Sequence, residues 1–181
     1  MSGAVQAMLH ISVSIHRKFE IACDLLGVET HFGNFERMLE DVPALKVTKV
    51  WGPHQYRIGY SSNFAGIYRV DLFSDVQARF DAANHALVVS PLRGLPSITA
   101  KATLWSLTGQ GDYASRLVFY AQKDGTVADY DLTITADIPK PVRLNLVPDS
   151  MARMTVQAVV QRRIQKITNL FIVRTKSRLA S

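Results

Sequence analysis

An alternation of apolar and polar residues with a period of two constrains the fold of this chain more than any other feature. Between residues 9 and 15, Leu, Ile or Val occupies every odd position, and His or Ser occupies the positions between them. Between residues 129 and 138, Tyr, Leu, Ile or Ala alternates with Asp or Thr. A period of two is expected of a β-strand that buries one face. Both stretches are therefore predicted to be strands with one apolar face.

The segment from residue 45 to residue 138 has the composition of successive strands joined by tight turns. Val, Ile, Tyr, Phe and Thr are frequent between clusters of turn-forming residues. The clusters are Gly52-Pro53, Ser61-Ser62-Asn63, Asp81-Ala82-Ala83-Asn84, Arg93-Gly94, Gly109-Gln110-Gly111-Asp112 and Lys123-Asp124-Gly125. This order predicts antiparallel hairpins. They include a strand over residues 98–104 and a strand over residues 113–122 that pairs with residues 129–138.

Two helical stretches interrupt the strand pattern. Asn34 is placed to cap a short helix over residues 35–42, which a proline ends. Residues 19–26 fit either a longer first strand or a short helix. After three prolines that end the sheet, a long helix is predicted to begin at residue 149 or 150.

The apolar residues of this closing helix share one arc of about 140 degrees, wide enough to cover a sheet. They are Val156, Val159, Val160, Ile164, Ile167, Leu170 and Phe171, with Gln157, Gln161, Arg162, Gln165, Thr168 and Asn169 on the other side. Arg153 and Arg163 fall within the apolar arc. Either both side chains extend past their neighbours to water or lie where the helix overhangs the sheet, or Arg163 reaches a cavity and pairs there with a carboxylate or an anionic ligand head group.

These elements predict an α+β fold in which a strongly curved antiparallel sheet of about six to seven strands wraps one C-terminal helix. A short helical excursion follows the first strand. With 181 residues the chain is long enough for one domain over residues 1–181, in which residues 1–8 and 176–181 are expected to be flexible. A sheet that bends around a single helix tends to leave a space beneath it, and this space is the candidate site.

The order of elements resembles the helix-grip fold of the START-like, or SRPBCC, superfamily. The resemblance is carried by residues 132–144, by Pro148 and by residues 164–170, and it extends over roughly residues 9–178. Within the superfamily the chain is most similar to a family of unknown function from cyanobacteria and plastids. The resemblance implies a hydrophobic ligand cavity and, from the distribution of that family, a role near photosynthetic membranes. The glycine-rich loop of the plant allergen branch is missing, and no motif of the aromatase-cyclase branch can be transferred to this sequence.

The cavity-lining residues are predicted from the aromatic side chains of the strands and the apolar arc of the helix. The candidates are Tyr60, Phe64, Tyr68, Trp105, Phe119 and Tyr130 on strands and Val160, Arg163, Ile164 and Ile167 on the helix. A pocket of this composition would bind a largely apolar or amphipathic molecule, such as a lipid, a quinone or a pigment. The alternative is that the aromatic rings fill the core themselves.

Signals of catalysis, metal binding and nucleotide binding are lacking. His10 and His16 lie about 20 Å apart along one strand, too far to share an ion. Cys23 has no base evident near it in the sequence, and neither a G-x-S-x-G elbow nor a phosphate-binding glycine motif occurs. We therefore expect a non-catalytic protein with no cofactor and no metal. A polyketide-cyclase-like enzyme that uses a Tyr or Asp in the cavity remains an alternative.

Charge is concentrated at the end of the chain. The net charge is +6, yet residues 150–181 contain seven basic residues and no acidic one. Arg174, Lys176 and Arg178 follow the apolar Phe171 and Ile172, which suits docking on an anionic membrane surface or an acidic protein. Nucleic-acid binding is disfavoured, because no aromatic strand platform accompanies the basic residues.

The sequence also bears on location. Its one cysteine excludes an intrachain disulfide and is compatible with a reducing compartment. The first ten residues lack signal-peptide features, and no run of about 18 apolar residues occurs. We expect a cytoplasmic protein, either free or peripheral on the cytoplasmic face of a membrane.

Overall fold

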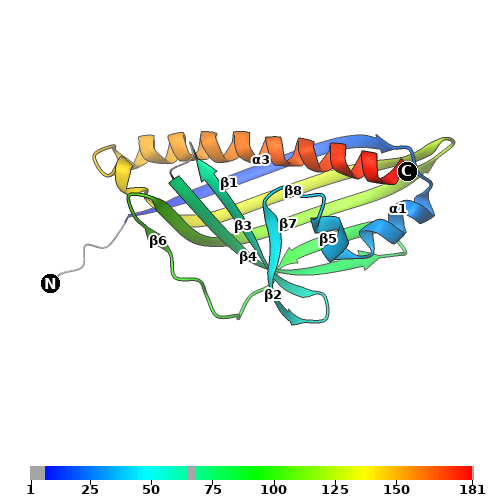
Figure 1. The fold of residues 1–181 in the computed structure, drawn as a ribbon, viewed down its shortest axis with the longest axis horizontal. Coiled ribbons are helices and arrows are strands. Elements are labelled where there is room, and N and C mark those ends of the chain that lie inside the picture. Colours follow the sequence, from blue (N-terminus) through cyan, green and yellow to red (C-terminus); the bar gives the residue numbers. More distant parts are fainter. Residues whose placement is uncertain (1–6, 65–67, 181) are drawn as a thin grey trace.

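The computed structural model describes residues 7–64 and 68–180, which form one large sheet, two short helices near its start and one long helix at its end (Figure 1). The strands are β1 (Met8–Ile21), β2 (Leu45–Gly52), β3 (Gln55–Phe64), β4 (Tyr68–Asp81), β5 (Ala86–Pro91), β6 (Lys101–Ala102), β7 (Ser106–Gln122) and β8 (Gly125–Pro139). The helices are α1 (Leu25–Phe32), α2 (Phe35–Leu39) and α3 (Asp149–Leu179), with a 3-10 turn, η1 (Val142–Leu144), before α3.

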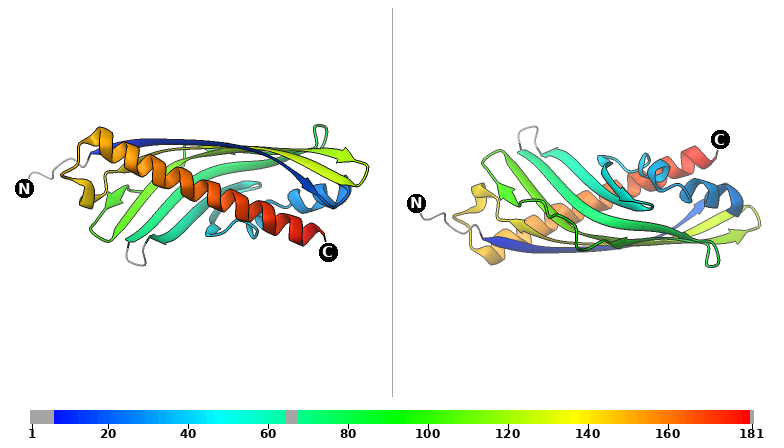
Figure 2. Two further views of the ribbon diagram at one scale, coloured as in Figure 1. Left: turned by 90° about the horizontal axis from the view of Figure 1, so that it is seen from above. Right: turned by 90° about the horizontal axis from the view of Figure 1, so that it is seen from below.

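The eight strands follow the order β1-β8-β7-β5-β4-β3-β2, with β6 paired to β7. The described strand pairs are antiparallel except for β4 and β7, which run parallel from Arg69 opposite Ser106 to Phe73 opposite Gln110. The later part of β7 pairs with β5, so this strand changes partner along its length. The sheet curves, and α3 lies across it (Figures 1 and 2). The predicted helix-grip fold is confirmed.

Two predicted turns lie inside strands. Gly109-Gln110-Gly111-Asp112 was expected to end a strand, but it lies inside β7, and Ser61-Ser62-Asn63 likewise lies inside β3. A Cβ atom added at Gly111 would lie 2.5 Å from the Thr135 carbonyl oxygen and 2.6 Å from the Ala136 Cβ atom of β8. Glycine is needed here because the two strand backbones approach closely, not because the chain turns.

The segment between β5 and β7 corrects a predicted strand. Within residues 98–104, only Lys101 and Ala102 form strand pairs. The backbone N–H of Ile98 donates instead to the side-chain oxygen of Gln110 at 2.7 Å. A side chain of β7 therefore supplies a hydrogen bond that a neighbouring strand would otherwise supply.

The ambiguous residues 19–26 contain both predicted structures. Strand β1 continues to Ile21, and α1 begins at Leu25 after Asp24, whose carboxylate accepts the Gly27 N–H at 2.8 Å. Asn34 caps α2 as predicted, because its side-chain oxygen accepts the Arg37 N–H at 3.0 Å. Helix α2 ends at residue 39, earlier than the predicted 42.

Helix α3 begins at Asp149, as predicted, and covers the concave face of the sheet along β1. Its buried residues are Ala152, Thr168, Phe171 and Thr175. Gln157 was predicted to face away from the sheet, but its side-chain oxygen accepts the Ser12 N–H at 3.1 Å and its amide donates to the Ser12 carbonyl. The helix therefore satisfies open backbone groups of the edge strand β1, which sequence periodicity does not reveal.

Within the described part of the chain, no helix has both the length and the apolar character needed to cross a bilayer.

Candidate functional site: a cavity between the sheet and α3

A cavity of about 330 Å³ lies between the sheet and α3. Its walls are mainly aliphatic and aromatic. They come from residues 42–45 (Val42, Pro43, Leu45), from β3 (Ile58, Tyr60), β4 (Tyr68, Val70, Leu72, Ser74), β7 (Leu107, Tyr113) and β8 (Tyr130, Leu132, Ile134, Ile138), from the turn before α3 (Pro141, Leu144) and from α3 (Thr155, Val156, Val159, Val160, Arg163, Ile164, Ile167, Thr168, Phe171). The volume falls at the lower end of the range typical of small-molecule pockets.

The strand pattern explains why these side chains meet. On β4, Val70, Leu72 and Ser74 are two residues apart and therefore point to the same face, and the alternation on β8 has the same effect. The residues between them, such as Asp71 on β4 and Thr133 on β8, point to the opposite face. The alternation that predicts the strands thus also builds the wall of the cavity.

Most of the predicted site residues line this cavity. They are Tyr60, Tyr68, Tyr130, Val160, Arg163, Ile164 and Ile167. The side chain of Phe64 lies outside the described part of the structure. Two of the predicted positions are not in the wall.

Trp105 and Phe119 were wrongly placed in the cavity. The Trp105 side chain is 61% exposed, because residues 103–105 form a turn outside the sheet, and Arg143 lies over its ring at 5.2 Å. Phe119 points inward but packs beyond the cavity, with its ring 4.8 Å from that of Phe32 in α1. The alternative that rings fill the core therefore holds for Phe119.

Many of the lining residues were not selected from the sequence, and three of them show which signals were missed. Tyr113 has the same parity on its strand as Phe119, so alternation along β7 was a signal for it. Thr168 was predicted on the outer side of the helix but is 3% exposed and lines the cavity. Leu144 belongs to the η1 turn, where no periodic signal exists.

Arg163 is the charged residue of the wall. Its Nε atom donates to the Tyr60 hydroxyl at 2.8 Å, and its Nη2 atom donates to Ser62 Oγ at 2.9 Å. Of the two alternatives for Arg163, the structure therefore shows the one in which the side chain reaches the cavity.

A second polar feature is the contact between two tyrosines of the wall. The hydroxyl oxygens of Tyr113 and Tyr130 lie 3.2 Å apart. Burial raises the pKa of both hydroxyls, that of Tyr130 well above its usual value. Both side chains are therefore uncharged hydrogen-bonding groups at neutral pH.

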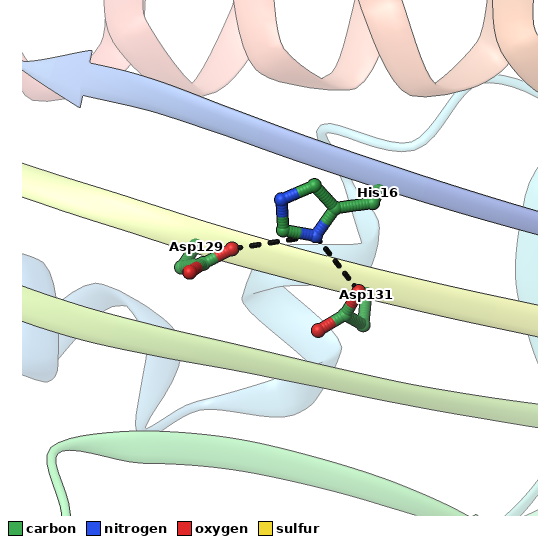
Figure 3. A group of neighbouring side chains, drawn as sticks. All are labelled: His16, Asp129 and Asp131. Carbon is green, nitrogen blue, oxygen red and sulfur yellow. Dashed lines mark hydrogen bonds and ion pairs between the residues drawn. The ribbon is translucent and has the colours of Figure 1, made fainter.

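The opposite face of the sheet carries a cluster of possible metal ligands (Figure 3). His16 Nδ1 lies 2.8 Å from Asp131 Oδ1 and 3.5 Å from Asp129 Oδ1, across the pairing of β1 with β8. The ligand atoms of these three residues lie within 4.8 Å of one another. His16 and Asp131 are largely exposed, and both aspartates pair with the histidine itself. Each aspartate thus has the histidine ring as a close contact, and the sheet separates the cluster from the cavity.

The three basic residues predicted to form a docking surface have different surroundings. Arg174 and Lys176 are exposed. Arg178 is engaged, because its Nε atom donates to Asp41 Oδ1 at 2.8 Å and its Nη1 atom donates to Glu40 Oε2 at 3.2 Å. Arg178 thus connects α3 to the segment after α2 through two ion pairs. Of the three predicted residues, Arg174 and Lys176 are the ones available to bind a partner.

No family model matches the chain, and no curated protein matches it. Solved structures do match. A START superfamily protein from Mycobacterium smegmatis has a TM-score of 0.53 at 13% identity, covering 92% of this chain and 96% of that one. A STAR-related lipid transfer protein fragment from Xanthomonas axonopodis has a TM-score of 0.53 at 10% identity, and the match covers 93% of this chain and 86% of that one. The Zhui aromatase/cyclase from a Streptomyces species has a TM-score of 0.50 at 11% identity, and the match covers 90% of this chain and 93% of that one.

These similarities define a class of fold. The chain has the helix-grip fold of START-like proteins, a fold in which binding proteins and cyclases both occur, so that function has to be argued from the site. The similarity to the cyanobacterial and plastid family stays a prediction.

Proposed function

We propose that this protein binds an apolar or amphipathic small molecule in the cavity beneath α3, without chemical turnover. The observation that carries the proposal is the cavity wall, in which aliphatic and aromatic side chains surround a few polar groups. Pockets of this composition suit largely apolar ligands that are oriented by a small number of hydrogen bonds. The similarity to a protein named for lipid transfer is consistent with this assignment.

The candidate ligand classes are lipids, quinones and pigments. The hydroxyl pair of Tyr113 and Tyr130 supplies a hydrogen-bond donor for a ligand carbonyl or hydroxyl group. Both phenols stay protonated at neutral pH, so they can donate the hydrogen bond that orients a ligand.

A cavity-filling variant tests the proposal. Nile red, an uncharged apolar dye, is expected to gain fluorescence saturably on binding the wild-type protein. Val160→Trp places a larger side chain in the cavity, so it should weaken dye binding about tenfold or more. Met154→Trp places the same ring on an exposed position of α3 and should leave dye binding unchanged.

The outcome is checked against folding. Thermal unfolding shows whether Val160→Trp is folded, and Ile134→Phe offers a smaller volume change in the same wall. If both folded variants bind Nile red as the wild type does, the cavity is not the binding site.

Attachment to an anionic membrane is a second candidate. It is favoured by the end of α3, where Val173 is 62% exposed beside the exposed Arg174 and, two residues further, Lys176. Exposed apolar and basic residues together suit a membrane interface, which would make the protein peripheral on a cytoplasmic membrane face. Sedimentation with phosphatidylserine vesicles should be lost in Arg174→Gln/Lys176→Gln and at high salt. Unchanged sedimentation would dismiss this role.

A further inference from the structure

Arg163 brings a positive charge to the wall of an otherwise apolar cavity. Among the described residues that line the cavity it is the only charged one, and no Asp or Glu lies there with it. Its two hydrogen-bond partners, Tyr60 and Ser62, are neutral. We propose, resting on the function proposed above, that the ligand is a single-chain amphiphile whose carboxylate head group binds Arg163.

The guanidinium has donors left for such a head group. An arginine side chain has five N–H groups in a planar fork. One on Nε serves Tyr60, and one on Nη2 serves Ser62, so three N–H groups are free of partners among the described residues. They lie on Nη1 and Nη2, the two terminal nitrogens. A carboxylate can accept two parallel hydrogen bonds from these nitrogens.

Strand β3 fixes the orientation of the arginine. Tyr60 and Ser62 are two residues apart on β3, so their side chains lie on the same face of the sheet. Each hydroxyl oxygen accepts one N–H of Arg163, which leaves each hydroxyl hydrogen to donate. A carboxylate beside Arg163 would therefore meet both the terminal nitrogens and two hydroxyl donors.

The partly buried charge of Arg163 should discriminate between charged and uncharged head groups. Arg163 is half-buried, and hydrogen bonds that involve ionised partners are roughly twice as strong as those between neutral ones. Charge interactions are also stronger beside apolar walls than at an exposed surface. An alcohol of the same chain length would accept a hydrogen bond from the guanidinium, but it has no negative charge to balance that of Arg163 and no second oxygen for a bidentate contact. The site should therefore prefer the acid over the alcohol.

A carboxylate fits this site better than a phosphate monoester. Arg163 offers a single positive charge, which a carboxylate balances one to one. A phosphate monoester carries close to two negative charges at neutral pH, so part of its charge would stay unpaired beside apolar side chains.

The remaining wall accommodates an apolar chain. Ile164, Ile167 and Phe171 continue along α3 from Arg163, with Leu72 and Ile134 in the facing strands. Each methylene that leaves water should strengthen binding about threefold to fourfold, until the cavity is filled.

Calorimetric titration of the full chain tests the inference. The probes are dodecanoate, dodecyl phosphate and uncharged dodecanol, each below its aggregation concentration. We expect dodecanoate to bind the wild type at least about tenfold more tightly than dodecanol, and more tightly than dodecyl phosphate. Arg163→Gln should remove this preference and leave dodecanol binding within about twofold.

Matched variants separate the cavity charge from charge in general. Arg162→Gln removes the same charge at the adjacent, exposed position and should not change the preference. Tyr60→Phe keeps the ring and removes the hydroxyl, so it should weaken dodecanoate binding by less than Arg163→Gln does. It also serves as the test if Arg163→Gln is not folded.

The possible failures are distinguishable. If dodecanoate and dodecanol bind equally and Arg163→Gln changes neither, the inference is overturned while the proposed function stands. If dodecyl phosphate binds more tightly than dodecanoate, the assignment of a carboxylate is overturned. If neither dodecanol nor dodecanoate binds the wild type, the proposed function itself fails.

Discussion

Arg178 donates from Nε to Asp41 Oδ1 at 2.8 Å, and this bond joins the last turn of α3 to the segment between α2 and β2. Asp41 is almost fully buried, and its other oxygen lies 3.1 Å from His31 Nε2 of α1. Thr175 of α3 also donates to that oxygen, at 3.4 Å. One carboxylate thus connects three segments at the end of the molecule where α1 and the C-terminus lie (Figure 1).

Removing Arg178 should destabilise the fold. Arg178→Ala leaves the buried Asp41 carboxylate without its cationic partner, which should cost about 1–3 kcal/mol of unfolding free energy. Urea unfolding measures the change. Lys166→Ala, an exposed position of the same helix, should change stability by less than about 0.5 kcal/mol. Equal small effects of both variants would mean that the Arg178–Asp41 contact contributes nothing.

Acidification should weaken the fold through His31. Burial lowers the pKa of His31 below its usual 6.5, and this effect outweighs the attraction of Asp41. The folded state therefore binds a proton less readily than the unfolded state, and stability should fall as pH drops below about 6.5. The slope of unfolding free energy against pH measures this. His31→Gln should flatten the slope, whereas His10→Gln, at an exposed position, should retain it; a wild-type slope in His31→Gln would contradict the assignment.

Alkaline pH should destabilise the fold through the hydroxyl groups of Tyr113 and Tyr130. Because burial raises the folded pKa of Tyr113 and Tyr130, their contribution to stability is complete below pH 10 and is lost as pH rises further. Unfolding free energy measured from pH 9 upward should therefore decline less in Tyr113→Phe/Tyr130→Phe than in the wild type. An identical decline would show that these phenols titrate normally in the folded state.

The two glycines of β7 should differ in their tolerance of a methyl group. A Cβ atom at Gly111 meets backbone of β8 at 2.5 Å, whereas one at Gly109 meets only side chains, at 3.2 Å from Ile138 and 3.3 Å from Leu72. Gly111→Ala should cost about 1–3 kcal/mol or more, and Gly109→Ala clearly less. Thermal unfolding of the two variants measures this difference. If Gly109→Ala were the less stable variant, β7 and β8 would not be as closely apposed at Gly111 as the structure shows.

Alternation in the sequence accounts for the strands and for much of the cavity wall. Leu132 and Ile134 are buried or half-buried because a strand with one apolar face turns every second residue inward, which is a local property. The inward positions of Tyr60 and Tyr130 follow from the same alternation, whereas that of Arg163 follows from its place within the apolar arc of the helix. The curvature of the sheet around α3 followed from having one long helix to cover it.

Long-range contacts account for what the sequence did not reveal. In the sequence Gly111 resembles a turn residue, but in the structure it allows close contact with β8. Trp105 resembles a strand residue, but its segment leaves the sheet and its side chain is exposed. Thr168 is buried because α3 contacts both the edge of the sheet and the cavity, so its covered face is wider than its apolar arc. None of these contacts is encoded in local periodicity.

Observation of a ligand in place tests the central claim most directly. With methyl-labelled protein and dodecanoate, nuclear Overhauser contacts should join the acyl chain to methyl groups of Ile134 and Ile164 in the cavity wall. Contacts confined to exposed apolar residues such as Leu146, which is fully exposed outside the cavity, would contradict the account.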